Sequence, residues 1–320
     1  MSKFGKLDLG LTPFVPFFKF WSGHTQTVLA HIIPSPEIGF ELQQEILTLR
    51  DGDQLHVEFH TGKVPITLSV YHGLGGNSRA DYMRRSASLA KQLGWNVVLV
   101  NHRAASSQAI SIKSYHSGRG EDAEQVISWC RKKFPGTTQV ALGFSMSGSI
   151  LLNLVTQRSG CDQPDFAIVV NSPLDLKKAA WGLDKGFNKI YDLRFFWILK
   201  RLILERQKMK LPIWGRTVDI DSAYTAPANY FKDRDDYYES CSTQNFLNRI
   251  QTRTFVLTSK DDPFIDVQDY ISADWSDFVH LTITDFGGHM GYYSKTSDPR
   301  QGRRWLDHYL ESVFHSIAKC

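Results

Sequence analysis

Strand patterns and helix patterns alternate along most of this chain, and that alternation limits the folds it can adopt. Short β-branched, apolar runs that read as strands lie at 66–71, 96–101, 139–144 and 166–171. Helical patterns between them lie at 82–93 and 121–134, and a third follows Ser145. Strands that alternate with helices indicate a parallel sheet with crossover helices on its faces.

Other runs extend this sheet in both directions along the chain. The earlier runs 46–50 and 55–60 flank an Asp51-Gly52 turn, which is typical of a hairpin and predicts an antiparallel start. Later strand patterns lie at 254–258 and 279–284, and an amphipathic helix is expected from about 301 to 318. The chain is therefore expected to form an α/β fold, mostly parallel, with an antiparallel start.

The alternation is interrupted after the strand at 166–171. From 173 to 250 the chain is helical and irregular and rich in Trp, Tyr and Asp. We interpret this stretch as an inserted, mainly helical cap over the edge of the sheet where a ligand binds. The predicted organisation is a core of 1–172 and 251–320 with a cap of 173–250.

One motif stands between a strand pattern and a helix pattern, at Gly143-Phe144-Ser145-Met146-Ser147-Gly148. A serine on a sharp strand-to-helix turn has its hydroxyl held out of the sheet at a helix N-terminus, which is the arrangement of a nucleophile elbow. Ser145 is the predicted nucleophile because Gly143 stands two residues before it, where the turn needs a small residue. Ser147 is the rival, but a serine stands two residues before it.

A glycine-rich loop follows the strand at 66–71 and reads His72-Gly73-Leu74-Gly75-Gly76. In α/β-hydrolases such a loop provides one oxyanion donor, and the residue after the nucleophile provides the other. We expect the backbone N–H groups of Leu74 and Met146 to fill these roles. His72 is expected to be a structural hydrogen-bonding residue, and no complete phosphate-binding glycine motif is found.

Two further loops after strands carry an acid and a base. The first contains Asp261 and Asp262, of which Asp262 is the preferred acid and Asp261 the alternative. The second contains His289 between glycines, where an imidazole could accept the serine proton. The order Ser145, Asp262, His289 is the order of an α/β-hydrolase triad.

Composition excludes several classes of protein. The formal net charge is only +4 and the basic residues are scattered, so no nucleic-acid partner is expected. The four cysteines have neither Cys-x-x-Cys nor zinc-ligand spacing, which favours a reducing compartment. The N-terminal apolar stretch is broken by Pro13 and Pro16, and no window approaches the ~20 apolar residues of a membrane span. We expect a cytoplasmic protein.

These motifs together resemble the YheT-like branch of the α/β-hydrolase superfamily, which is related to mammalian lipid-directed members. The landmarks that carry the resemblance span nearly the whole chain: Gly23-His24-Thr25-Gln26-Thr27, His72-Gly73-Leu74, Arg103, Tyr115-His116-Ser117-Gly118, Gly143-Phe144-Ser145-Met146, Asp261-Asp262-Pro263-Phe264 and Gly288-His289. The resemblance implies a serine esterase or lipase with the same triad and no cofactor. The chain departs from the pattern at Ser147-Gly148 and at Arg103-Ala104-Ala105-Ser106, which bears on substrate geometry.

The sequence thus predicts an α/β-hydrolase fold and a serine carboxylic-ester hydrolase acting on an acyl ester or lipid. Acyl transfer, thioester chemistry and a non-catalytic binding protein of the same fold are the alternatives. The stretch 194–210 places Phe195, Ile198, Leu199 and Leu202 on one helical face and carries six basic residues beside the single acid Glu205. This helix either covers the core with a solvated basic face, which we favour, or makes a weak peripheral contact with anionic lipid.

Overall fold

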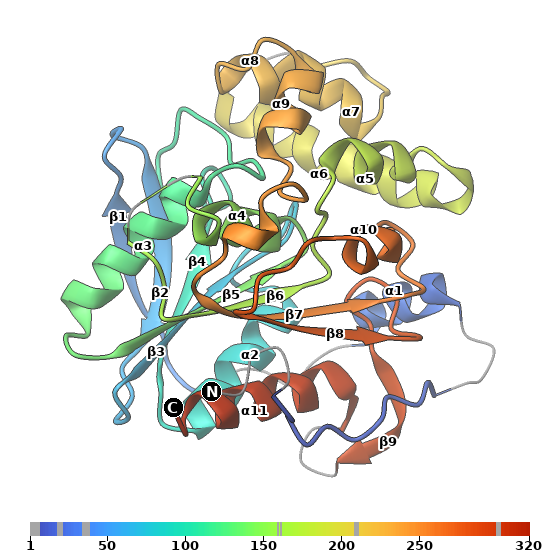
Figure 1. Cartoon of the computed structure of the whole chain (residues 1–320). Coiled ribbons are helices and arrows are strands. Elements are labelled where there is room, and N and C mark those ends of the chain that lie inside the picture. The colour runs from blue at the N-terminus through green and yellow to red at the C-terminus, as the bar shows by residue number, and fades with distance from the viewer. Residues whose placement is uncertain are drawn as a thin grey trace.

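A computed structural model of the chain describes residues 7–17, 22–33, 39–158, 160, 162–207, 211–298 and 302–320. Its centre is an eight-stranded sheet in the order β1-β2-β4-β3-β5-β6-β7-β8 (Figure 1). The strands are β1 Gln43–Thr48, β2 Gln54–His60, β3 Ile66–Tyr71, β4 Asn96–Asn101, β5 Thr138–Phe144, β6 Phe166–Val170, β7 Arg253–Ser259 and β8 Val279–Thr284. β2 pairs antiparallel with β1 and β4, and every other pair is parallel, which confirms the predicted sheet.

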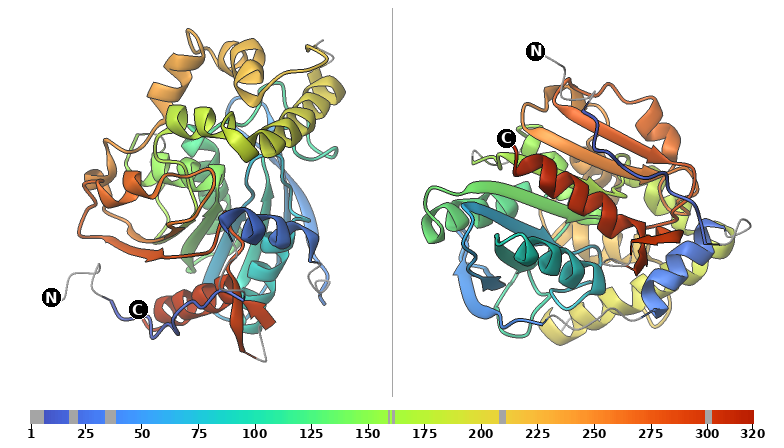
Figure 2. Two further views of the ribbon diagram at one scale, coloured as in Figure 1. Left: turned by 90° about the vertical axis from the view of Figure 1, so that its right-hand side faces the viewer. Right: turned by 90° about the horizontal axis from the view of Figure 1, so that it is seen from below.

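Helices cover both faces of the sheet, which explains why the central strands are apolar at nearly every position. Each residue of β3, β4 and β6 is buried, as expected for parallel strands covered on two sides. Helices α3 Gly120–Lys133 and α4 Met146–Val155 contribute to the hydrophobic core on one face, whereas α2 Asp81–Gln92 and α11 Trp305–Ile317 contribute to the core on the other. Figure 2 shows α2 and α11 side by side on their face.

The segment between β6 and β7 forms a helical layer. It consists of α5 Leu176–Leu183, α6 Lys189–Gln207, α7 Thr217–Ile220, α8 Ala226–Ala228 and α9 Arg234–Cys241, with the short turns η2 Gly186–Asn188, η3 Asp221–Thr225 and η4 Leu247–Arg249. In Figure 1 the helices α5 to α9 lie at the top of the view, above α4 and to one side of the sheet. These helices fall within the stretch 173–250, but Leu247 of η4 packs in the core of the sheet, and the division of the chain into core and cap stays a prediction.

The two ends of the chain differ from the sequence predictions. The last helix begins at Trp305 instead of 301, because β10 Gly302–Arg304 pairs antiparallel with β9 Tyr293–Asp298. Arg304 is buried, has an extended backbone and donates a side-chain hydrogen bond to the Ile33 carbonyl oxygen. Helix α1 Gly23–Ile32 was not predicted either, and a long-range pairing of Phe17 with Tyr293 ties this region to β9.

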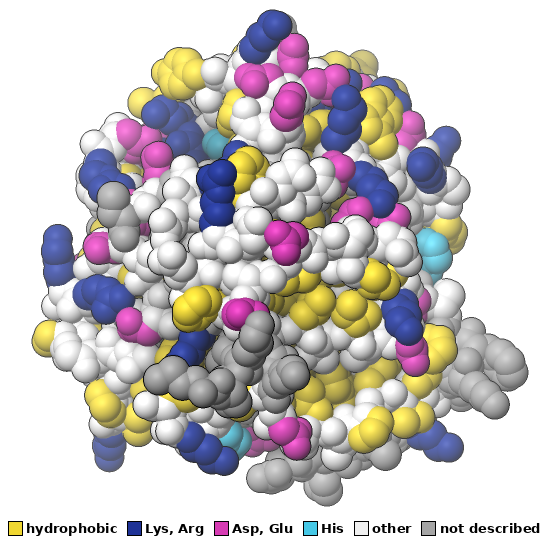
Figure 3. Space-filling view, in the orientation of Figure 1, with side chains coloured by type: hydrophobic (Ala, Val, Ile, Leu, Met, Phe, Trp, Pro, Cys, Tyr) yellow, Lys and Arg dark blue, Asp and Glu magenta, His cyan; other side chains and the backbone are white. Residues whose placement is uncertain are grey.

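The surface and the cysteines bear on the predicted compartment and partners. No helix in the described ranges is long and apolar enough to cross a membrane. Basic and acidic side chains are interspersed on the face shown in Figure 3, and no patch of a single sign dominates it. Cys130 and Cys241 are buried free thiols, whereas Cys320 is exposed and Cys161 lies outside the described residues. The cytoplasmic location and the absence of a nucleic-acid partner stay predictions.

Candidate active site

The strand-to-helix turn after β5 has the geometry expected of a nucleophile elbow. Ser145 follows β5 directly and has φ 53° and ψ −122°, a conformation that L residues rarely adopt. A Cβ on Gly143 would lie 2.5 Å from the Ser147 carbonyl oxygen, and a Cβ on Gly148 would lie 2.6 Å from the Ser172 Cβ. Both glycines are therefore required by the close approach of neighbouring backbone and side chains.

The three predicted side chains lie in one hydrogen-bonded chain, although 144 positions separate Ser145 from His289. The Ser145 Oγ lies 2.9 Å from the His289 Nε2, and the His289 Nδ1 lies 2.9 Å from an Asp262 carboxylate oxygen. Ser145 follows β5, His289 follows β8 and Asp262 follows β7, so all three lie at the carboxyl ends of these parallel strands. The geometry permits the hydroxyl to donate to Nε2 while Nδ1–H donates to the carboxylate.

The two candidate acids occupy different environments. Asp262 also accepts backbone N–H bonds from Phe264 and Ile265 at 2.9 and 3.1 Å, so its carboxylate is held in a fixed orientation. Asp261 instead accepts a hydrogen bond from the Gly288 N–H at 2.8 Å. Burial raises the pKa of Asp261. Of these two acids, only Asp262 lies within hydrogen-bonding distance of the His289 ring.

Ser147 is buried and engaged elsewhere. Its hydroxyl donates to the His72 carbonyl oxygen and lies 2.7 Å from the His102 Nε2. Burial lowers the pKa of His102 to about 4, so this imidazole is neutral and can donate from Nε2. His72 has the structural role expected of it, because its Nδ1 donates to the Gly73 carbonyl oxygen and its Nε2 accepts from the His102 N–H.

The His72–Gly76 loop leaves one particular N–H without a partner. The Gly73 N–H donates to the Tyr82 hydroxyl at 2.9 Å, and the Gly75 N–H donates to the Tyr115 hydroxyl at 2.7 Å. Within the described residues, the intervening N–H of Leu74 and the first helical N–H of Met146 have no acceptor. These are the two groups that the sequence assigns to an oxyanion hole.

Two residues that sequence reasoning missed support the acid. Asn171 follows β6 with φ 48°, and its side-chain amide donates to the Asp262 carboxylate at 2.8 Å. The buried Tyr292 hydroxyl in turn donates to the Asn171 amide oxygen at 2.9 Å. An Asn at a strand end is a common turn signal, so nothing in the sequence distinguished this one.

Helix α1 supports the histidine loop, and it contains the Gly23–Thr27 motif. The Thr27 hydroxyl accepts the His289 N–H at 2.9 Å and donates to the Gly23 carbonyl oxygen at 2.7 Å. A Cβ on Gly23 would lie 1.6 Å from the Asp261 carbonyl oxygen, and one on Gly288 would lie 2.2 Å from the Gly23 carbonyl oxygen. The motif therefore holds the acid loop and the base loop against each other.

Arg103, which is a landmark of the resemblance and the first residue of the departing stretch Arg103-Ala104-Ala105-Ser106, is the centre of a buried ion cluster. The Arg103 guanidinium forms a two-pronged pair with Asp122 at 2.6 and 2.7 Å and also contacts Asp51 and Asp53. Burial opposes its charge, but these carboxylates more than offset that effect and raise the pKa of Arg103. The cluster ties the hairpin turn at Asp51 to the loop after β4, and Ala104 there takes the left-handed φ of 61°.

Two cavities meet at Ser145. Measured as all the space between its lining atoms, open solvent included, the larger is about 1120 Å³; it runs under the cap and is mainly apolar. The smaller, about 870 Å³, lies on the α1 side and includes Thr27, Val28 and Arg194. Both are bordered by the same five residues: Leu74, Ser145, Phe195, Phe264 and His289.

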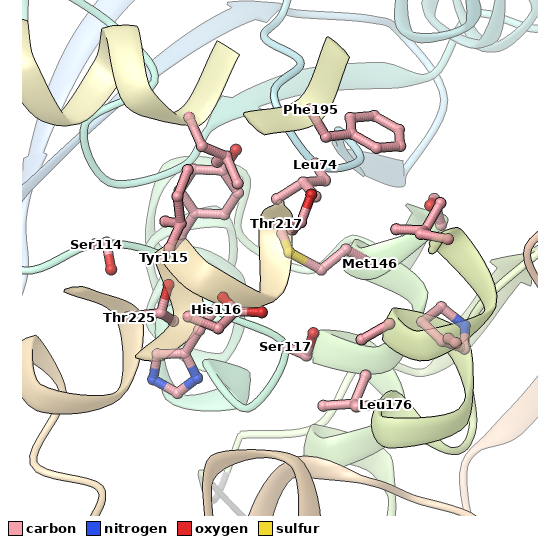
Figure 4. Close-up of a pocket in the computed structure, with 18 of the residues that line it drawn as sticks. Leu74, Ser114, Tyr115, His116, Ser117, Met146, Leu176, Phe195, Thr217 and Thr225 are labelled. Carbon is pink, nitrogen blue, oxygen red and sulfur yellow. The ribbon is translucent and has the colours of Figure 1, made fainter. Parts of the chain in front are cut away.

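Figure 4 shows how the larger cavity is built. Side chains from the His72–Gly76 loop (Leu74), from α4 (Met146) and from the cap (Phe195, Thr217) gather around one space. His116 borders this cavity, and its Nδ1 accepts the Gly118 N–H, so this imidazole supports the loop that contains it. No group of three His, Cys, Asp or Glu side chains in the described part of the chain could hold a metal ion.

Comparisons with known proteins agree with this geometry. The Escherichia coli (strain K12) protein "Putative esterase YheT" is 29% identical over 93% of this chain and 94% of its own length. Human "Phospholipase ABHD3" is 24% identical over 93% of this chain and 76% of its own length. The solved structure of the Pyrococcus furiosus esterase Pf2001 superposes with a TM-score of 0.59 at 15% identity, covering 90% of this chain and 94% of that one. No protein-family model matches the chain.

The eight-stranded sheet, the elbow and these similarities define the class of protein, which is an ester hydrolase of the α/β-hydrolase superfamily. Within that superfamily the chain is similar to the YheT-like branch, as the YheT comparison shows.

Proposed function

We propose that the chain is a serine carboxylic-ester hydrolase with Ser145 as nucleophile, His289 as general base and Asp262 as the acid that orients it. The observation that carries the proposal is the continuous chain of two 2.9 Å contacts from the Ser145 hydroxyl through the imidazole to Asp262. The strained turn, which directs Ser145 out of the sheet, supports the same assignment.

The mechanism follows from the positions of these groups. The Ser145 Oγ attacks the acyl carbon while its proton passes to the His289 Nε2, and the Leu74 and Met146 N–H groups stabilise the oxyanion. The carbon–oxygen bond to the alcohol then breaks, and the imidazolium returns its proton to the leaving oxygen. Water attacks the acyl-enzyme with His289 again as base, which releases the carboxylic acid and restores Ser145.

The cavities support an acyl ester or lipid as the substrate. The larger cavity is lined mainly by apolar side chains, among them Leu176, Leu199 and Ile203, and so suits an acyl chain. The smaller cavity also reaches Ser145 and His289, so a leaving alcohol held there lies within reach of the imidazole that protonates it. We assign the acyl chain to the first and the alcohol to the second.

Labelling with a fluorophosphonate tests this proposal, because the reagent reacts with an activated serine. We expect the intact mass to rise by one adduct, located on Ser145 by peptide mapping. Ser145→Ala should abolish both labelling and turnover of p-nitrophenyl esters, whereas the matched control Ser147→Ala should keep measurable turnover. A folded protein that takes up no label would favour a binding protein, and a label on Ser147 would contradict the assignment of the nucleophile.

A further inference from the structure

The long cap helix α6 Lys189–Gln207 is apolar on two faces. Its inward face carries Phe195, Leu199, Leu202 and Ile203, all of which border the larger cavity. Three of these four residues, Phe195, Leu199 and Leu202, belong to the apolar face that the sequence predicted, whereas the predicted Ile198 does not border this cavity. A second set of large apolar residues on the same helix is exposed to solvent.

The outward residues form a stripe, which consists of Ile190, Leu193, Trp197 and Leu204. Each is 40–58% exposed. Their spacings of three, four and seven residues place them within about 60° of the helix circumference at 100° per residue. Exposed apolar residues scattered singly are ordinary, but a continuous stripe of this kind indicates a surface that contacts something apolar.

Neighbouring segments widen the stripe. Phe187 precedes the helix, and Ile213 and Trp214 follow it, and all three are more than half exposed. The rings of Trp197 and Trp214 meet edge to face with centroids 5.5 Å apart. Buried Lys200 donates to the carbonyl oxygens of Pro212 and Ile213, so it fixes this turn against the helix. The expectation of a fully solvated basic face is therefore wrong at Lys200.

Basic side chains border the stripe on both sides. Exposed Lys189 and Arg194 have no ion-pair partner within the described residues, whereas Arg201 pairs with Glu205 at 2.7 Å. Lys208 and Lys210 lie outside the described residues. An apolar stripe containing tryptophan and bordered by unpaired cations complements the surface of an anionic bilayer, where aromatic rings lie at the headgroups and cations meet phosphates.

The stripe lies beside an entrance to the site. Arg194 follows Leu193 of the stripe and also borders the smaller cavity, together with the strongly exposed Ile32. We propose that the stripe docks the cap on an anionic lipid surface, with the opening of the smaller cavity next to the bilayer. An acyl ester could then reach Ser145 from the membrane. The docking itself does not depend on the proposed chemistry.

Co-sedimentation with vesicles of phosphatidylcholine, with and without phosphatidylglycerol, tests the proposal. We expect the protein to bind the anionic vesicles and to be released as salt rises. The variant Ile190→Ser/Trp197→Ser should lower the partition coefficient at least about tenfold, because it removes two side chains that enter the bilayer. The variant Lys189→Glu/Arg194→Glu should weaken binding and remove most of its salt dependence.

The matched control is Ile110→Ser/Ile112→Ser, which replaces two residues that are each about three-quarters exposed but lie on the loop next to β2. This control should bind vesicles as the unchanged protein does, and circular dichroism should show that all variants fold. Unchanged binding by the stripe variant would overturn the proposal. An absence of vesicle binding by the unchanged protein would also overturn it. In that case, an unchanged protein that is a dimer and a stripe variant that is a monomer would show that the stripe is a dimer interface.

Discussion

At the scale of single residues, neighbouring positions in the chain face different partners. Asp261 and Asp262 are adjacent, yet one holds the Gly288 backbone and the other holds the His289 ring. The loop has to supply both contacts, because Gly288 and His289 are adjacent as well. A pair of acids at this position thus fixes both the backbone and the imidazole of the loop that follows β8.

Replacing the two acids in turn separates these roles. Asp262→Asn should lower kcat on the order of 10⁴-fold, because an amide cannot hold the required tautomer or stabilise the imidazolium. Asp261→Asn should cost far less, since it leaves the Nδ1 contact intact. Steady-state kinetics with a p-nitrophenyl ester measures both variants. The reverse ranking would transfer the orienting role to Asp261.

At the scale of elements, the junction of β5 and α4 depends on contacts too close for a side chain at Gly143. A helix that starts one residue after a strand requires its first turn to pass over the strand's last residues. The Ser147 carbonyl oxygen would consequently lie only 2.5 Å from a Cβ at Gly143. The strained conformation of Ser145 and the absence of a side chain at Gly143 thus have the same cause, which is the close approach of the first turn of α4 to the end of β5.

The variant Gly143→Ala should therefore lower the free energy of unfolding by about 1–3 kcal/mol, the usual cost of overpacking a core. It should also slow ester turnover, because the elbow has to shift to make room. Urea unfolding measures the first effect. Gly39→Ala is the matched control, since a Cβ there has open space and should change stability little. Equal stability of the two variants would contradict this account of the elbow.

At the scale of the whole molecule, the three buried histidines with the largest pKa shifts make the fold sensitive to mild acid. Burial lowers the pKa of His102 to about 4, and it lowers the pKa values of His72 and His116 well below the ordinary value. The unfolded chain binds protons on these residues below pH ~6.5, whereas the folded chain does not. Their contribution to stability is therefore complete above pH ~6.5 and is lost as pH falls.

Asp221 acts in the opposite direction. Burial raises its pKa to about 6, so as pH falls the folded state binds a proton on Asp221 before the unfolded state does. The stability that this proton contributes is lost as pH rises through 6. Asp51, whose pKa is lowered to about 2 by its pairs with Arg103 and Lys113 despite burial, loses its contribution only below about pH 4. The change in the free energy of unfolding between pH 7 and pH 5 therefore comes mainly from the histidines.

We expect the free energy of unfolding to fall by about 3–5 kcal/mol between pH 7 and pH 5, at about 1.4 kcal/mol per pH unit for each histidine, less the opposing effect of Asp221. Urea titrations at several pH values measure this slope. His116→Asn should make this fall smaller by about 2 kcal/mol, because one of the three groups is removed. A free energy that does not change over this interval would show that these histidines are not buried as neutral groups.

Local patterns were sufficient for the sheet and for the main features of the site. The strands at 66–71, 96–101 and 279–284 were predicted to the residue, because their apolar periodicity is a property of a few adjacent positions. Ser145 and Gly143 could be found for the same reason, since the turn that strains the serine is complete within a few residues. The acid and the base followed from the order of strand ends along the chain.

Long-range contacts decided the rest. Three features of the site depend on residues that are brought together only when the sheet forms. They are the choice of aspartate that contacts His289, the N–H of the His72–Gly76 loop that is left without an acceptor, and the support of the triad by Asn171 and Thr27. The sequence showed that α6 is apolar and basic, but only the packed cap shows which apolar face borders the cavity and which is left in solvent. Periodicity specifies that a helix has a face, whereas the neighbours of that face depend on the fold.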